Sequence, residues 1–214
     1  MPSPWSTELD QRWPGVAWRI LFHGTGHDVP AFTEESIGRG ADANAALGVH
    51  LAEFPDVAAD YAVDSAASDA TARRPRVLIV ALPARHPHPE WDSSVFFGLE
   101  DPGIPGQTDP IAAWTSADFV RWRQQLRERG HDAIDYEDGD QVITVALDPA
   151  DAVILGEMTV EAARAFREVM DEEDVSFEGA ARLERLATWT DLTWRPVPDS
   201  LQPRSPGRAA PRLR

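Results

Sequence analysis

The chain alternates between two hydrophobic periodicities, and these divide it into expected strands and helices. Short apolar or alternating runs predict strands at residues 16–25, 48–53 and 74–85, the last a β-branched run bounded by prolines. Residues 131–149 predict two further strands, separated by an acidic turn at Asp138–Asp140. These five segments supply enough strand for at least one sheet.

Four segments carry the spacing of helices. Residues 55–68 begin at Pro55, which suits a first helical turn because the N–H that proline lacks would be unpaired there. Residues 116–130 are predicted as a helix with Ser116 as N-cap and Gly130 just beyond its end. Amphipathic spacing predicts the last two helices at residues 159–174 and 177–189.

The remaining segments are expected to be irregular. Residues 1–15 are polar and contain proline, which indicates a loose lead-in, and residues 33–48 are a Gly- and Ala-rich connection, helix or loop. Residues 86–112 combine many Pro and Gly with Trp91, Phe96 and Phe97, typical of a long excursion that shapes a site or forms a satellite core.

The order of strands, helices and strands favours an α+β fold over a regular βαβ array. We expect one domain over residues 1–195, with its core at 17–155 and a helical C-terminal extension at 157–190. Residues 196–214 are rich in Pro, Ser and Arg and are expected to be a disordered tail.

Composition removes several kinds of chemistry. The chain has no Cys, which excludes disulfides, Cys-ligated zinc and a thiol nucleophile. It has no Lys either, so Schiff-base and P-loop chemistry are excluded. The 36 acidic and 20 basic residues give a net charge of −16, a field that disfavours nucleic acid as a partner. No segment approaches a membrane span or a signal peptide, so we expect a cytoplasmic protein without a membrane partner.

Three short stretches offer candidate chemistry, each with a structural alternative. His23, before Gly24 and Thr25, either caps a strand end or binds a ligand hydroxyl that the glycine lets approach. Tyr61, among small alanines, is either a core residue or a platform on which a flat heterocycle stacks. Gln141 either faces water or sits at the polar mouth of a strand face that it shares with Ile143.

Taken in order, these stretches resemble the ADP-ribosyltransferase superfamily, and most closely its diphtheria-toxin-like branch with a His-Tyr-Glu triad. That branch includes the catalytic domains of poly-ADP-ribose polymerases and transferase domains of phage and bacterial polyvalent proteins. The motifs are HGT at residues 23–25, the ungapped segment from Gly48 to Tyr61, and GHDAI at 130–134 followed by a strand ending in LDP. The resemblance covers residues 17–155.

The resemblance implies split, mostly antiparallel sheets around an NAD cleft, with peripheral helices. It implies that His23 hydrogen-bonds the adenine-side ribose and that Gly24 offers its backbone to the nicotinamide carboxamide. Thr25 would support that loop. Tyr61 would stack on the nicotinamide ring, and His50 would form another wall of the pocket.

The third triad position departs from the family. Counted back from LDP, the family's Glu falls on Ile143, and Gln141 could replace it if the strand is bulged. Glu137 and Asp140, in the adjacent turn, are further candidates. Ala58 also stands where many relatives have a Ser that binds the carboxamide, which would weaken NAD affinity.

The implied activity is mono-ADP-ribosyl transfer from NAD to a macromolecular acceptor, expected to be a protein, with release of nicotinamide. Positive charge develops on the ribose, so positioning and electrostatics supply most of the catalysis. NAD is then a substrate, and no metal is needed. The protein would act in the cytoplasm or, as a toxin or phage effector, in a target cell. Two alternatives stay open, an NAD glycohydrolase and a catalytically inactive acidic binding module on the same fold.

Overall fold

The protein is described here by a computed structural model. The residues that it describes are 4–39, 42–69, 71–72, 74–84, 87–91, 114–138, 141–173 and 179–196. The helices are α1 (Pro4–Arg12), α2 (Pro55–Ser68), α4 (Ser116–Glu128), α5 (Val160–Glu173) and α6 (Gly179–Ala187), with short 3-10 turns η1 (Glu34–Ser36), η2 (Ala43–Ala46) and η4 (Pro149–Asp151). The strands are β1 (Trp18–Thr25), β2 (Val49–Ala52), β3 (Arg76–Pro83), β4 (Pro87–Trp91), β5 (Ala133–Asp138), β6 (Gln141–Ala146), β7 (Val153–Thr159) and β8 (Leu192–Trp194).

The strands form one sheet in the order β4-β5-β6-β2-β1-β3-β7-β8. Every neighbouring pair is antiparallel except β4 and β5, which are parallel. The predicted α+β class is therefore confirmed. Strands and helices are not arranged as repeated crossovers, which agrees with the largely antiparallel pairing.

The sheet is nearly divided between β1 and β2. These strands are paired at a single position, Phe22 with Ala52, whereas β1 is paired with β3 along its whole length from Trp18 to Thr25. On the other side, β2 is paired with β6 from Val49 to Ala52. One half, β1-β3-β7-β8, and the other, β2-β6-β5-β4, thus meet at one point of the ladder.

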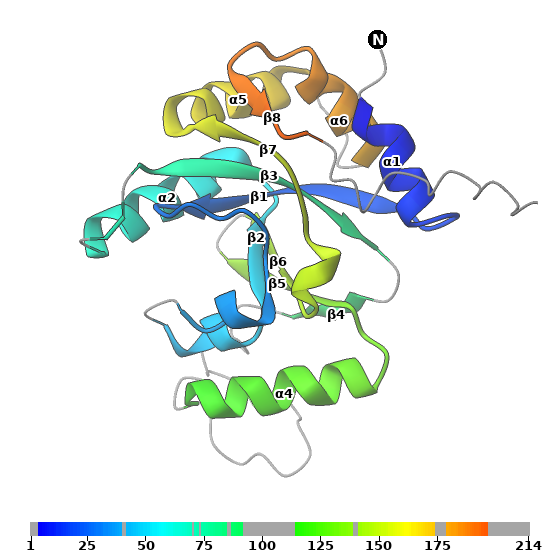
Figure 1. The fold of residues 1–214 in the computed structure, drawn as a ribbon, viewed down its shortest axis with the longest axis vertical. Coiled ribbons are helices and arrows are strands. Elements are labelled where there is room, and N and C mark those ends of the chain that lie inside the picture. The colour runs from blue at the N-terminus through cyan, green and yellow to red at the C-terminus, as the bar shows by residue number, and fades with distance from the viewer. Residues whose placement is uncertain are drawn as a thin grey trace, which may run out of the picture.

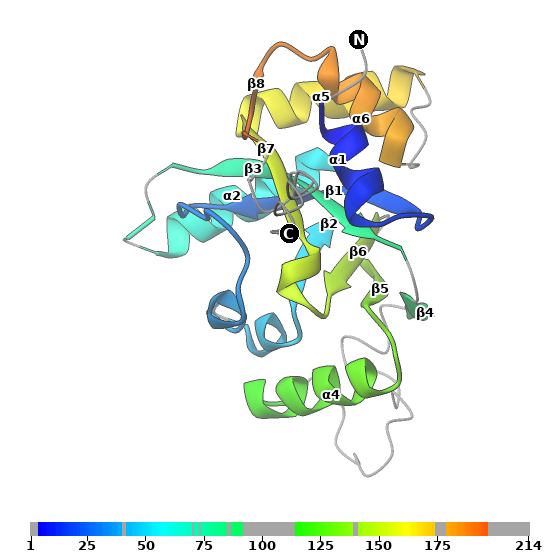
Figure 2. The same cartoon turned by 45° about the vertical axis from the view of Figure 1, so that its right-hand side comes forward.

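Four of the described helices, α1, α4, α5 and α6, lie at the two ends of the molecule. Figures 1 and 2 both show α1, α5 and α6 together beyond β1, β3 and β7, with α4 at the opposite end near β5 and β6. Helix α2 packs against β1 and α5. One large apolar cluster includes side chains of each helix in the described residues, and a smaller cluster covers the other face of the central strands. In the described part of the chain, no helix is both long enough and apolar enough to cross a membrane.

The lead-in expected at residues 1–15 is wrong. Residues 4–12 form helix α1, because Trp5 and Leu9 occur at helical spacing and are completely buried. Trp13, just beyond the helix, continues this apolar stripe and is only 3% exposed. The stripe anchors the segment to the main core.

Other boundaries also differ from the expectation. Residues 87–91, expected in an irregular excursion, form strand β4 at the edge of the sheet, while residues 92–113, with Phe96 and Phe97, lie outside the described residues. Strands β7 and β8 were not expected. The N-cap of α4 is Thr115 rather than Ser116, since Thr115 and Asp118 form a reciprocal capping box. The expected tail also lies outside the described residues from residue 197 onward.

Candidate functional site

Helix α2 crosses strand β1 at Gly24. A Cβ atom on Gly24 would lie 1.9 Å from the carbonyl oxygen of Ala58 and 2.7 Å from the amide nitrogen of Ala62. The two backbones are therefore in direct contact, which only glycine on the strand and small residues on the helix allow. This contact places the helical turn that carries Tyr61 beside the end of β1, and it accounts for Gly24 through packing.

His23 is held at the junction of the two half-sheets. Its Nδ1 lies 2.9 Å from the carbonyl oxygen of His50, and its ring makes an edge contact with Phe32 at 5.1 Å between centroids. Because a carbonyl can only accept, Nδ1 carries the proton and Nε2 is the acceptor. Burial lowers the pKa of His23, against the effect of that hydrogen bond, so the ring is neutral at pH 7.

His50 has both ring nitrogens occupied. Nε2 donates to the carbonyl oxygen of Asn44 at 3.0 Å, and Nδ1 accepts from the Tyr136 hydroxyl at 3.4 Å. Burial lowers the pKa of His50 to about 4, with His23 adding to the effect. His50 is thus a fixed, neutral wall of this region with no free nitrogen for a ligand.

Tyr61 joins α2 to the β5–β6 hairpin. Its hydroxyl donates to Oδ2 of Asp138 at 3.0 Å, while 48% of the residue is exposed. Burial raises the pKa of Tyr61 to about 12, and the carboxylate of Asp138 adds to that effect. The hydroxyl is therefore protonated and anchored, and part of the side chain remains open to solvent.

The hairpin presents Gln141 next to this contact. Gln141 is directly opposite Asp138 in the β5–β6 pairing, and its Oε1 is buried without a hydrogen-bond partner among the described residues. Ile143 is opposite Tyr136, only 2% exposed, and packed in the main core. The position that the family's Glu would occupy is thus an apolar core position in this chain.

The other candidate residues are placed more simply. Thr25 is 5% exposed, and its Oγ1 accepts a hydrogen bond from the His27 backbone at 3.1 Å, which fixes the turn after β1. Glu137 is exposed and, one residue before Asp138 on a strand, points to the opposite face of the sheet. Asp140 lies outside the described residues.

Asp138 and Tyr136 are the residues of this region that sequence reasoning missed as site residues. The signal for Asp138 was its place directly before the turn of a predicted hairpin, on the same strand face as Tyr136. The described residues contain no group of three or more His, Asp or Glu arranged to hold a metal ion. Tyr61, Asp138 and Gln141 bring together a partly exposed tyrosine, one carboxylate and an amide oxygen without a hydrogen-bond partner among the described residues. His23 alternates on β1 with Phe22 and Gly24 and contacts Phe32, so its side chain points to the other face of the sheet.

A separate cavity of about 200 Å³ lies on the sheet face opposite to Gln141 and Ile143, the face to which His23 also points. It is lined by Arg19, Ile20, Leu21, Glu53, Asp135, Val142, Thr144 and Arg182. Val142 and Thr144 alternate along β6 with Gln141 and Ile143, so the two pairs face opposite sides. The residues that line the cavity do not include His23, His50, Tyr61, Asp138 or Gln141.

Comparison of the chain with protein-family models found no match, and neither the curated proteins nor the solved structures that were searched gave one.

Proposed function

We propose that the protein is an NAD-dependent mono-ADP-ribosyltransferase. It transfers ADP-ribose from NAD to a macromolecular acceptor, which we expect to be a protein, and releases nicotinamide. The observation that carries the proposal is the hydrogen bond from Tyr61 to Asp138 at 3.0 Å. It joins the helical Tyr to the late hairpin, two of the three stretches that carry the resemblance. The resemblance of these stretches to the ADP-ribosyltransferase superfamily supplies the reaction.

The residues have distinct roles in the proposed reaction. The exposed part of Tyr61 gives the nicotinamide ring a surface for stacking, and the anchored hydroxyl keeps the ring in one orientation. His23 accepts a hydrogen bond from a ribose hydroxyl at Nε2, because Nδ1 is committed to His50. A neutral imidazole also adds no positive charge beside the cationic ribose that develops during transfer.

We assign the third position to Asp138, with Gln141 beside it. A carboxylate is needed to stabilise positive charge on the ribose, and Asp138 is the carboxylate that contacts Tyr61. Gln141 offers an unpartnered amide oxygen that can accept a ribose hydroxyl. Ile143 is excluded from a polar role by its apolar side chain and its burial in the core.

The test uses NAD labelled in the adenosine part, incubated with the purified protein and a cell lysate. Wild type is expected to release nicotinamide and to label macromolecules, and Tyr61→Ala and Asp138→Asn are each expected to lower the rate at least tenfold. Val120→Ala is the matched control, because Val120 is also an exposed apolar residue, 51% exposed, but lies on α4.

Three other outcomes would be decisive. Free ADP-ribose without labelled macromolecules would identify an NAD glycohydrolase. Absence of nicotinamide release, with no NAD binding in calorimetry, would refute both reactions and leave the acidic binding module. Equal rates for wild type and Tyr61→Ala would refute this assignment of the site.

A further inference from the structure

The two halves of the sheet are joined by very little backbone. Strands β1 and β2 are paired only at Phe22 and Ala52, whereas β2 and β6 are paired at four positions and β1 and β3 at eight. We call the line between β1 and β2 the seam. It is the place where the sheet can bend with the least loss of backbone pairing, because the ladders on either side of it stay intact.

On both sides of this single pair, a side chain replaces the missing ladder. Nδ1 of His23, on β1, donates to the carbonyl oxygen of His50, on β2, at 2.9 Å. On the other side, Nη1 of Arg182 donates to the carbonyl oxygen of Ile20, on β1, and to that of Glu53, directly after β2, each at 2.9 Å. The seam is thus closed by side chains, which can rotate about their own torsions without disturbing a strand ladder.

Two further polar contacts cross the seam at a greater distance from the pair. Arg19, on β1, donates to both carboxylate oxygens of Asp135, on β5, at 3.1 and 3.2 Å. Tyr61 lies on α2, whose backbone touches β1 at Gly24, and its hydroxyl donates to Asp138 of β5 at 3.0 Å. Tyr61 therefore belongs to one half of the molecule and Asp138 to the other.

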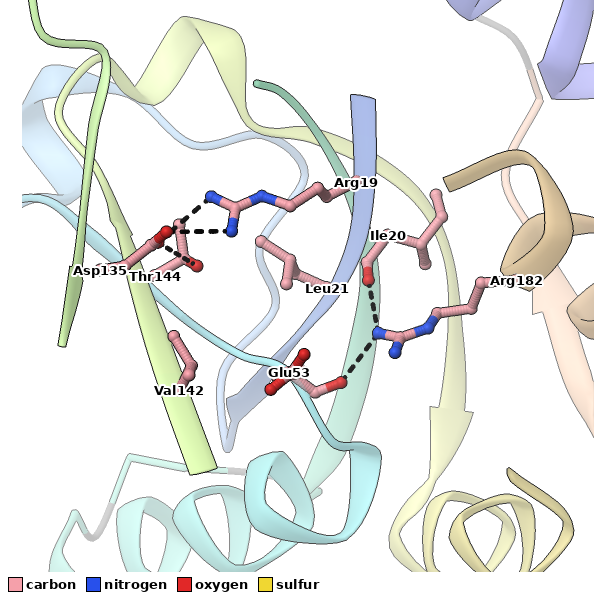
Figure 3. A pocket seen from close by; sticks show the side chains of 8 residues that line it. All are labelled: Arg19, Ile20, Leu21, Glu53, Asp135, Val142, Thr144 and Arg182. Atoms are coloured by element: carbon pink, nitrogen blue, oxygen red, sulfur yellow. Dashed lines mark hydrogen bonds and ion pairs between the residues drawn. The ribbon is translucent and has the colours of Figure 1, made fainter. Parts of the chain in front are cut away.

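The seam also contains open space. Strand β2 ends at Ala52, and the cavity of about 200 Å³ lies beside that end, lined by residues of both halves. Figure 3 shows Arg19, paired with Asp135, and Arg182 at different sides of this space. Burial raises the pKa of the Glu53 carboxyl in the lining, and this outweighs the lowering by Arg182 and other neighbours. Opening of the seam would let water reach this poorly solvated acid.

We propose that the seam is a hinge, at which the two half-sheets rotate relative to each other about their single backbone pair. Both apolar clusters continue across the seam, so the rotation is small and leaves most of the core packing intact. In the closed state Tyr61 contacts Asp138, and in the open state this contact and the bond from Arg19 to Asp135 are broken. The hinge thus assembles and separates the region to which we assign the transferase reaction, although the motion itself does not depend on that assignment.

The test measures distances between pairs of spin labels by pulsed electron paramagnetic resonance, for which a chain without Cys is well suited. Val63→Cys on α2 and Glu137→Cys on β5 place labels at exposed positions on opposite sides of the seam. Val63→Cys and Ala165→Cys, on the helix α5 that packs against α2, place labels within one half. We expect a main and a longer minor distance across the seam, but a single distance within the half.

Two variants of the same chemical kind separate hinge opening from general loosening. Arg19→Gln removes the ion pair across the seam and should raise the ratio of the longer to the shorter distance about fivefold, as expected for a partly exposed pair. Arg164→Gln removes the ion pair with Asp60, at 2.7 Å between α5 and α2 within one half, and should leave that ratio unchanged. Circular dichroism checks that each labelled variant is folded.

Two results would overturn the proposal. The first is a distance across the seam that is single, as narrow as the distance within the half, and the same in wild type and Arg19→Gln. The second is an equal change in Arg19→Gln and Arg164→Gln, which would show a general loosening of the fold. The measurement uses neither NAD nor nicotinamide release, so failure here and failure of the transferase proposal can be told apart.

Discussion

Substitution of Gly24 by alanine tests the packing on which the candidate site depends. The added Cβ would lie 1.9 Å from the carbonyl oxygen of Ala58, whereas ordinary contacts begin at 3.4 Å, so strand and helix must separate by about 1.5 Å. Backbone atoms are on both sides, and no side-chain rotation can relieve the overlap. Overpacking of a core costs about 1–3 kcal/mol. We expect the upper end, a loss of about 3 kcal/mol, because a whole helix must move.

The assay is urea denaturation followed by circular dichroism, with Gly15→Ala as the matched control. Gly15 has φ +73° and nothing within 4 Å of a built Cβ, so alanine there meets only left-handed backbone strain, about 1–2 kcal/mol. Gly24→Ala should therefore be clearly the less stable variant. A stability for Gly24→Ala within about 1 kcal/mol of wild type would refute the direct contact between α2 and β1.

Two further predictions concern buried side chains that can carry a charge, His50 and Arg182. His50, with its pKa lowered to about 4, is neutral in the folded protein but protonated in the unfolded chain below about pH 6.5. The free energy of unfolding should therefore fall by about 3 kcal/mol as the pH is lowered from 6.5 to 4. Equal free energies of unfolding at these two pH values, measured by urea titration, would contradict this. The raised pKa of Glu53 acts in the opposite sense and offsets part of the loss. Arg182→Met should lower the free energy of unfolding by about 2–4 kcal/mol, because it removes the donor to the carbonyl oxygens of Ile20 and Glu53. An unchanged melting temperature would show that the buried guanidinium does not stabilise the fold.

The sequence predicted those helices and strands whose ends are marked by neighbouring residues such as proline or an acidic turn. Pro55 marks the start of α2, and residues 55–68 form that helix as expected. The hairpin around the acidic turn also follows the sequence, since β5 and β6 flank it in register from Ala133 to Asp138. Helix α1 was missed although its signal was local, because the prolines and polar residues around Trp5 and Leu9 masked their helical spacing.

Other features depend on contacts between distant segments, and no local pattern contains them. Strand β8 has three residues and owes its conformation to pairing with β7. Gly24 is required because a helix about 35 residues further along the chain packs directly on it, and this contact is known only from the structure. The contact between Tyr61 and Asp138 likewise joins residues 77 positions apart, so the sequence indicated an acidic turn but not the carboxylate within it.

The single-pair junction between β1 and β2 has a consequence for the order in which the chain can fold during synthesis. Strand β1 finds its full partner in β3, which follows within the first 83 residues. Strand β2, although made before β3, is paired along its length only with β6, which is complete at residue 146. Most backbone hydrogen-bonding groups of β2 can therefore be paired only after more than 90 further residues have been synthesised. A nascent chain can pair β1 with β3 early, while the strand that carries His50 is the last of the N-terminal strands to be paired along its length.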